Sequence, residues 1–80
     1  MSTGLDCRFI HLTSGWYYLL ESSVYHEVYH AWGPFGSFAA TTEHLRDNQA
    51  NPGGYSVPPR DAPAREPSAY ESELIKDARR

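Results

Sequence analysis

The 80-residue sequence has little cysteine, little positive charge and no long apolar run. Its single cysteine, Cys7, cannot form an internal disulfide, which favours a reducing compartment such as the cytoplasm. Seven lysines and arginines against ten acidic residues give a net charge of −3, which argues against nucleic acid or an anionic membrane as a partner. No apolar stretch reaches the roughly 18 residues of a membrane span, and the N-terminus lacks a signal-peptide pattern.

Large apolar side chains are concentrated in residues 15–35, GWYYLLESSVYHEVYHAWGPF. The chain has six tyrosines, three phenylalanines and two tryptophans. Because a tyrosine ring carries a polar tip, this composition is typical of half-exposed or contact surfaces. A chain of this length forms one domain of marginal stability unless a partner or another element covers its apolar surface.

The pattern predicts three consecutive strands, at residues 7–12, 16–21 and 24–32. The second segment does not alternate cleanly between apolar and polar residues. We therefore expect both of its faces to be partly covered.

The third segment, residues 24–32, is ambiguous between strand and helix. Its valine, tyrosine, histidine and tryptophan content favours a strand, and it holds few strong helix formers. As a strand it would present alternate residues on one face: Val24, His26, Val28, His30 and Trp32. The Gly33-Pro34 pair that follows should end either element, because proline fixes φ and has no N–H to donate.

Two helices are predicted in the second half of the chain. Ser37 is a suitable N-cap for a helix from Phe38 to about Asn48, and a short last strand follows at residues 55–57. Residues 58–67 hold four of the six prolines and predict an extended linker. Ser68 and Glu71 form a capping-box pattern that opens a C-terminal helix at residues 68–80.

These elements predict an α+β fold. We expect a small antiparallel sheet of three to four strands with one packed helix, a Pro-rich linker and a C-terminal helix. The corresponding domain organisation is a disordered N-terminus at 1–6, a ββαβ-type domain at 7–57, the linker at 58–67 and a docking helix at 68–80.

One string matches a catalytic motif. His26-Glu27-Val28-Tyr29-His30 fits the H-E-x-x-H pattern of zinc peptidases, in which a helix places both histidines one turn apart. On a strand the two histidines would be about 13 Å apart, too far to share one zinc ion. Because the strand is favoured, the zinc-dependent hydrolase using His26, Glu27 and His30 is the alternative, and we expect no catalytic residues and no cofactor.

A structural zinc site is a second metal alternative. Cys7 and His11, together with His26 and His30, supply four potential ligands in two pairs spaced four residues apart. Zinc ribbons and fingers usually use cysteine pairs with shorter spacing. The simpler interpretation is a buried free thiol and surface histidines.

The aromatic residues suggest a contact surface for another protein. Tryptophan and tyrosine dominate the energetically important positions of protein interfaces. The expected partner-binding residues on the sheet and on the C-terminal helix are Trp16, Tyr18, Tyr25, Tyr29, Trp32, Tyr70, Leu74 and Ile75. The alternative is that the C-terminal helix covers the aromatic face of its own sheet, or that of a neighbour in a self-associated pair.

The succession Trp32-Gly33-Pro34-Phe35, a small helix opened by Ser37, and Asn51-Pro52-Gly53-Gly54 resembles small uncharacterised proteins encoded by phages of actinobacteria. The strand, the Gly-Pro-Phe turn and the helix are also similar to SPOR-type peptidoglycan-binding repeats, which are ββαβ units. The first resemblance implies a phage accessory, host-interaction or virion-associated protein, found in the host cytoplasm or on the virion. Together with the aromatic surface, it predicts a non-enzymatic protein-interaction module.

Overall fold

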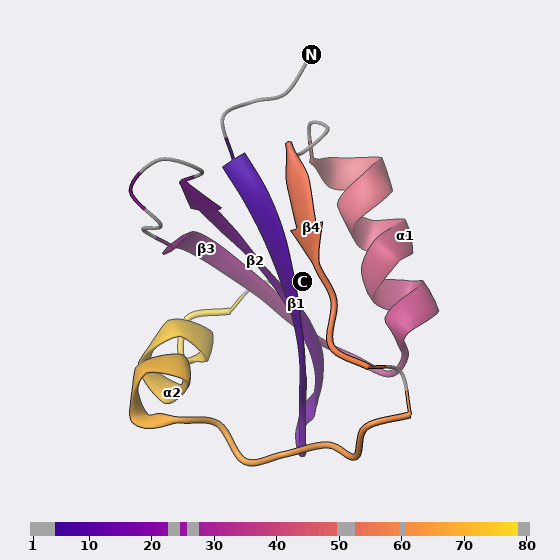
Figure 1. Cartoon of the computed structure of the whole chain (residues 1–80), viewed down its shortest axis with the longest axis vertical. Coiled ribbons are helices and arrows are strands. Elements are labelled where there is room, and N and C mark those ends of the chain that lie inside the picture. Colours follow the sequence, from indigo (N-terminus) through magenta and orange to yellow (C-terminus); the bar gives the residue numbers. More distant parts are fainter. Residues whose placement is uncertain (1–4, 23–24, 26–27, 50–52, 60, 79–80) are drawn as a thin grey trace.

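The computed structural model describes residues 5–22, 25, 28–49, 53–59 and 61–78, without the side chain of Tyr29. Figure 1 shows the elements in chain order. They are β1 Leu5–Leu12, β2 Gly15–Ser22, β3 Val28–Phe35, α1 Phe38–Asn48, β4 Gly54–Ser56 and α2 Ala69–Ile75. The predicted α+β class is confirmed, and β1 begins at Leu5, earlier than expected.

The four strands form one sheet in the order β3-β2-β1-β4. β1 and β2 are antiparallel around a tight turn that ends at Gly15, where φ is +139°. β2 and β3 are also antiparallel, whereas β4 pairs parallel to β1. The expectation of a purely antiparallel sheet is therefore wrong for its last strand. β3 runs in the same direction as β1, and α1 carries the chain back before β4 begins, so β4 also runs in that direction.

β3 continues through Gly33-Pro34 to Phe35, contrary to the expected break. Proline is tolerated here because β3 is an edge strand, on which a missing N–H need not break a ladder hydrogen bond. The Gly33–Pro34 peptide bond is cis, and φ at Gly33 is +141°. A Cβ atom at Gly33 would lie 2.6 Å from Tyr17 Cδ2, so glycine permits the close approach of β2 and β3 at this point.

An irregularity in the β2–β3 pairing changes the face on which part of β3 lies. Leu20 pairs with His30, but the next residue of β2, Glu21, pairs with Val28. The extra residue places Val28 on the opposite side of the sheet from Trp32, as a β-bulge does. The prediction that Val28, His30 and Trp32 share a face is therefore wrong.

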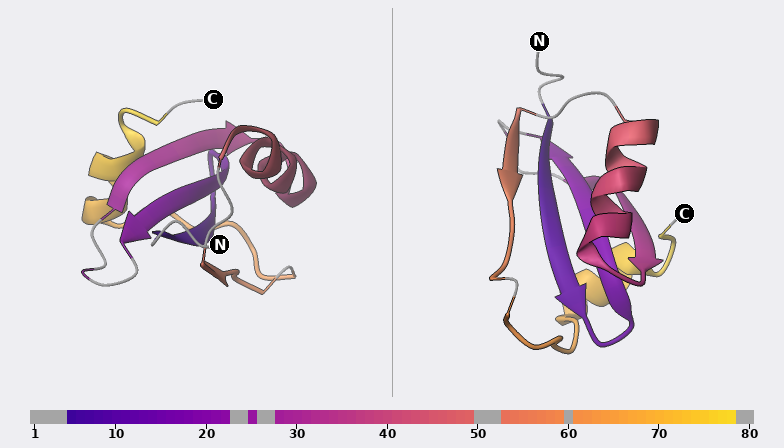
Figure 2. Two further views of the ribbon diagram at one scale, coloured as in Figure 1. Left: turned by 90° about the horizontal axis from the view of Figure 1, so that it is seen from above. Right: turned by 90° about the vertical axis from the view of Figure 1, so that its right-hand side faces the viewer.

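Each face of the sheet is covered by one helix, and β2 between them is buried on both sides (Figure 2). On one face, α1 packs on a cluster of buried residues that we call the α1-side cluster: Cys7, Phe9, Trp16, Tyr18, Leu20 and Leu45. On the other face, α2 packs on the α2-side cluster: Ile10, Leu12, Tyr17, Leu19 and Ala31. The expectation that both faces of β2 are covered is confirmed.

Both predicted helix starts are confirmed. The Ser37 side chain accepts a hydrogen bond from the backbone N–H of Ala40 at 3.1 Å and opens α1. The Ser68 hydroxyl accepts from the Glu71 N–H at 3.1 Å, while Glu71 Oε1 accepts from the Ser68 N–H at 2.9 Å. This reciprocal capping box fixes the first turn of α2.

The segment between β4 and α2 is attached to the sheet. Thr13 donates its N–H to the carbonyl of Arg65 at 3.0 Å, and Arg65 donates to the carbonyl of His11 at 3.3 Å. These bonds hold the proline-rich segment at the end of β1. From there the chain continues into α2, which packs on the α2-side cluster. Neither helix in the described part of the chain has the length and apolar character needed to cross a membrane.

Candidate functional site

The main candidate site is a groove between α1 and β4. Among the described elements, α1 lies over β2 and β3, and it reaches β1 through side chains such as Phe38, which packs on Phe9. The helix therefore lies to one side of the sheet and leaves part of its face without a covering helix. The groove, with a volume of about 420 Å³, occupies this uncovered part.

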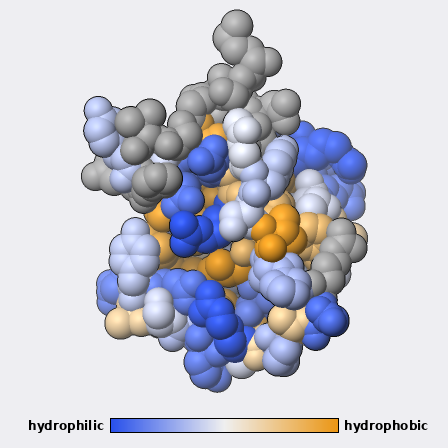
Figure 3. Space-filling view, viewed as in Figure 1, coloured by the Kyte–Doolittle hydropathy of each residue, from blue (hydrophilic) through white to orange (hydrophobic). Residues whose placement is uncertain are grey.

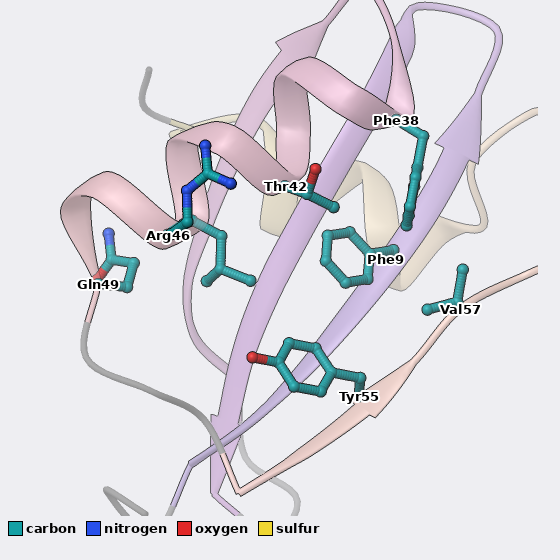
Figure 4. A pocket seen from close by; sticks show the side chains of 8 residues that line it. Phe9, Phe38, Thr42, Arg46, Gln49, Tyr55 and Val57 are labelled. Atoms are coloured by element: carbon teal, nitrogen blue, oxygen red, sulfur yellow. The ribbon is translucent and has the colours of Figure 1, made fainter.

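Aromatic side chains form the floor and much of the walls of the groove. Phe9 of β1 forms the floor, and its ring centre lies 5.1 Å from that of Phe38 on α1 and 6.4 Å from that of Tyr55 on β4. Val57, directly after β4, completes the apolar side (Figure 4). Tyr55 is 57% exposed and Val57 is 45% exposed. Figure 3 shows hydrophobic surface in this region, bordered by hydrophilic residues.

The opposite end of the groove is polar. Arg46, in the last turn of α1, and Gln49, which caps its C-terminus, lie at this end, while Phe38 and Val57 lie at the other (Figure 4). Arg46 is the one charged residue among the eight that line the groove. Its ion pair with the neighbouring Asp47 is long, at 3.7 Å, and both side chains are mostly exposed. Such a pair contributes little, so the guanidinium can bind another acceptor.

Partly buried hydrogen bonds hold the polar end in place. The Tyr18 hydroxyl, fully buried under α1, is 2.7 Å from His44 Nδ1 and accepts from Gln49 Nε2 at 3.3 Å. Burial raises the pKa of Tyr18 to about 12, although the Gln49 hydrogen bond acts in the opposite direction. Tyr18 is therefore neutral at physiological pH and anchors the last turns of α1 to the sheet.

The structure separates the predicted partner-binding residues. Trp16 and Tyr18 are buried in the α1-side cluster, and Trp32 is partly buried beside them, its ring stacked on Tyr18 at 5.1 Å. These three side chains therefore belong to the core and are not an open platform. The helix that covers them is α1, not the C-terminal helix as the alternative supposed.

The remaining predicted contact residues lie elsewhere. Tyr25 is 78% exposed and Tyr70 is 62% exposed. Leu74 and Ile75 of α2 are half-buried against the α2-side cluster of their own sheet. The side chain of Tyr29 lies outside the described residues. Tyr25, Tyr70, Leu74 and Ile75 do not line the groove.

The metal alternatives fall partly outside the described residues. His26 and Glu27 are not among them, while Val28 to His30 are extended in β3. This half of the string therefore does not have the helical geometry of a zinc-peptidase motif. Among the described residues, no three histidine, cysteine, aspartate or glutamate side chains lie together as metal ligands. Cys7 is buried, and burial raises its pKa to about 12.

A second, more polar hollow lies at the β1–β2 turn, beside His11, Ser14 and Trp16. The His11 ring stacks on Trp16 at 4.2 Å, and its buried Nδ1 atom has no hydrogen-bond partner among the described residues. One unpartnered nitrogen needs no more than a single water molecule.

The groove residues were not singled out from the sequence. Phe9, Phe38, Tyr55 and Val57 are separated by up to 48 positions and come from three elements and one loop. The one local signal is Tyr55-Ser56-Val57, in which two large side chains two residues apart lie on and directly after a short edge strand. Comparison of the chain with protein-family models, with curated proteins and with solved structures finds no match.

Proposed function

We propose that this protein is a small non-catalytic binding module that takes up a segment of a partner protein in the groove between α1 and β4. One observation carries the proposal. Of the four large apolar side chains that lie exposed among the described residues, two, Tyr55 and Val57, line this groove. Apolar side chains gathered in one hollow favour a binding site, whereas singly exposed ones are ordinary.

The shape and lining of the groove support this proposal. Its volume of about 420 Å³ lies within the range of ordinary ligand sites. Protein interfaces are enriched in aromatic residues and arginine and depleted in lysine, aspartate and glutamate. The lining contains Phe9, Phe38, Tyr55 and Arg46 and no acidic residue.

The chemistry of the described residues favours binding over catalysis. General acid–base catalysis works best with a group whose pKa is near the working pH. The described residues that line the groove include no histidine, cysteine, aspartate or glutamate, which are the usual general acids and bases. The Cys7 thiol, with its pKa raised to about 12, remains protonated and is a poor nucleophile.

The resemblance to small phage proteins suggests the setting for this binding. We propose an accessory, inhibitory or virion-associated role, carried out in the host cytoplasm or on the virion. In this proposal the tail helix is a structural part of the module. Leu74 and Ile75 are half-buried against its own sheet, so they are not offered to a partner.

The experiment is a selection of short peptides from a display library against the whole protein, followed by affinity measurements on two variants. Thr42→Trp would fill the groove, since Thr42 lies on its wall. Ala40→Trp is the matched control, because Ala40 is exposed on the same helix and does not line the groove. Urea unfolding would establish that both variants fold.

We expect selected peptides to bind the wild type and Ala40→Trp equally and to bind Thr42→Trp at least about tenfold more weakly, a loss of about 1.4 kcal/mol. Peptides that bind all three proteins with the same affinity would place the site elsewhere. A selection that yields no binding peptide would also count against the proposal.

A further inference from the structure

We infer that the segment bound in the groove combines large apolar side chains with a carboxylate, and that the carboxylate pairs with Arg46. This inference rests on the proposed function and specifies the chemistry of the partner. It follows from the uneven distribution of polarity along the groove and from the single charge in its lining.

The two ends of the groove differ in character (Figure 4). At one end, Phe38 and Val57 stand beside the Phe9 ring and offer apolar surface alone. At the other end lie Gln49 and Arg46, whose exposed guanidinium is turned away from Phe9 and Tyr55 in Figure 4. A wholly apolar ligand would make no use of this guanidinium, whose contact with Asp47 is long and exposed. An amphipathic ligand would match both ends.

Charge complementarity sets the sign of the polar group. Arg46 is the one charged residue lining the groove, and no acidic side chain competes from within it. Its present contact with Asp47 uses one nitrogen at 3.7 Å, between two side chains that are 75% and 60% exposed. A guanidinium prefers two parallel hydrogen bonds to a carboxylate, so an incoming carboxylate would make a better contact than Asp47 does.

One effect opposes the binding of a carboxylate near Arg46. Arg46 lies in the last turn of α1, where the helix dipole places partial negative charge. A charge-assisted contact with a guanidinium is stronger than this dipole effect at an exposed position. The net preference for a carboxylate should therefore be modest and sensitive to salt.

The length of the groove sets the spacing within the ligand. Arg46 lies four residues beyond Thr42 and eight beyond Phe38 on α1, or roughly 6 and 12 Å at 1.5 Å per residue. In an extended peptide, side chains two and four residues apart share a face and are separated by about 7 and 13 Å. Five residues with apolar side chains at the first and third positions and a carboxylate at the fifth therefore match the groove.

Two blocked peptides test the inference. One is acetyl-Phe-Ser-Leu-Ser-Asp-amide and the other has the same residues in reverse order, so that both directions of a bound peptide along the groove are tested. Each is compared with its counterpart in which asparagine replaces aspartate. Binding is measured by titration calorimetry or by NMR shifts, at peptide concentrations up to the order of 1 mM. The proteins are the wild type, Arg46→Gln and Thr42→Trp.

We expect one aspartate peptide to bind the wild type about fivefold more tightly than its asparagine counterpart, as for an ion pair of about 1 kcal/mol. The difference should disappear in Arg46→Gln and shrink when salt rises from about 0.05 to 0.5 M. Thr42→Trp should weaken the binding of both peptides.

Several outcomes would overturn the inference. Equal binding of the aspartate and asparagine peptides, both blocked by Thr42→Trp, would reject the carboxylate and leave the proposed function standing. Failure of all four peptides would reject this ligand chemistry, while the display selection decides the proposed function independently. Equally tight binding of 3-phenylpropionate would assign the groove to small acids. Self-association abolished by Thr42→Trp would assign it to a second copy of the chain.

Discussion

Replacing Glu71 by glutamine tests how α2 is held on the sheet. Glu71 accepts two hydrogen bonds from Arg65, from Nη1 to Oε1 and from Nη2 at 2.7 Å to Oε2. It also completes the capping box with Ser68. The Arg65 hydrogen bonds are the main reason why the pKa of Glu71 is lowered from its usual 4.5 to about 2. Arg65 in turn is anchored to His11 of β1 and to Thr13 in the turn that follows it.

The lowered pKa of Glu71 gives the magnitude of its contribution to stability. A difference between 4.5 and about 2 corresponds to at most about 3 kcal/mol, at 1.36 kcal/mol per tenfold change in proton affinity. Arg65 is 54% exposed, so solvent screening reduces this figure. We expect Glu71→Gln to lower the free energy of unfolding of α2 by about 1 to 2 kcal/mol at neutral pH.

The pH dependence follows from the direction of the pKa change. The carboxylate form is favoured in the folded state, so its stabilisation is complete above the usual pKa of 4.5 and is lost as the pH falls towards 2. At about pH 3, less than half of the difference between wild type and Glu71→Gln should remain.

Hydrogen exchange at the Ser72 amide, which donates to the Ser68 carbonyl at 2.8 Å, would report the opening of α2. Urea unfolding followed by tryptophan fluorescence would report global stability. Glu73→Gln is the matched control, because Glu73 makes an exposed pair with Lys76 at 3.7 Å and should cost no more than about 0.5 kcal/mol. If both variants behaved alike, or if the difference persisted unchanged to low pH, the ion pair would not hold α2.

Three further perturbations probe the sheet. In urea unfolding, Gly33→Ala should lower the stability of the fold by more than about 2 kcal/mol, because the new Cβ would lie 2.6 Å from Tyr17 Cδ2 at a φ of +141°. Gly36→Ala is the control and should be nearly neutral, because a Cβ there would meet nothing within 4 Å. Tyr18→Phe should cost about 1 to 2 kcal/mol through the loss of its contacts with His44 and Gln49, and a stability equal to the wild type would disprove their importance. The Cys7 thiol should react with a disulfide reagent far more slowly in the native protein than in concentrated urea, because it is 1% exposed with a pKa of about 12; equally fast reaction would contradict its burial.

Local signals in the sequence predicted the helices well. Ser37 and Ser68 cap α1 and α2 as expected, because a capping side chain bonds to backbone only three residues away. The first two strands were also placed within a few residues, since their apolar runs are bounded by a clear turn. For these elements, the residues that determine the structure are neighbours in the chain.

Features that depend on distant pairing were not predicted. Gly33-Pro34 was expected to end β3, but the strand continues because the site lies at a sheet edge and faces Tyr17. The face of the sheet on which Val28 lies depends on a bulge opposite Glu21, and no local sequence pattern predicts this bulge. The parallel pairing of β4 likewise depends on where α1 returns the chain.

The groove could not be predicted for the same reason. It exists because α1 lies over β2 and β3 and leaves the β4 side of the sheet without a covering helix. Phe9 and Phe38 read as ordinary core residues in the sequence, and Arg46 as an ordinary charge on the outer side of a helix. Their common position becomes apparent only when the helix is placed on the sheet.

The two apolar clusters share β2 but no residue, because alternate side chains of this strand enter opposite sides. Phe9 and Leu45, which line the groove, belong to one cluster, while Ile10, Leu12 and Leu19 belong to the other. Substitutions on the two sides should thus combine almost additively. The residues that line the groove can therefore change without disturbing the opposite side of the sheet, which keeps the chain folded.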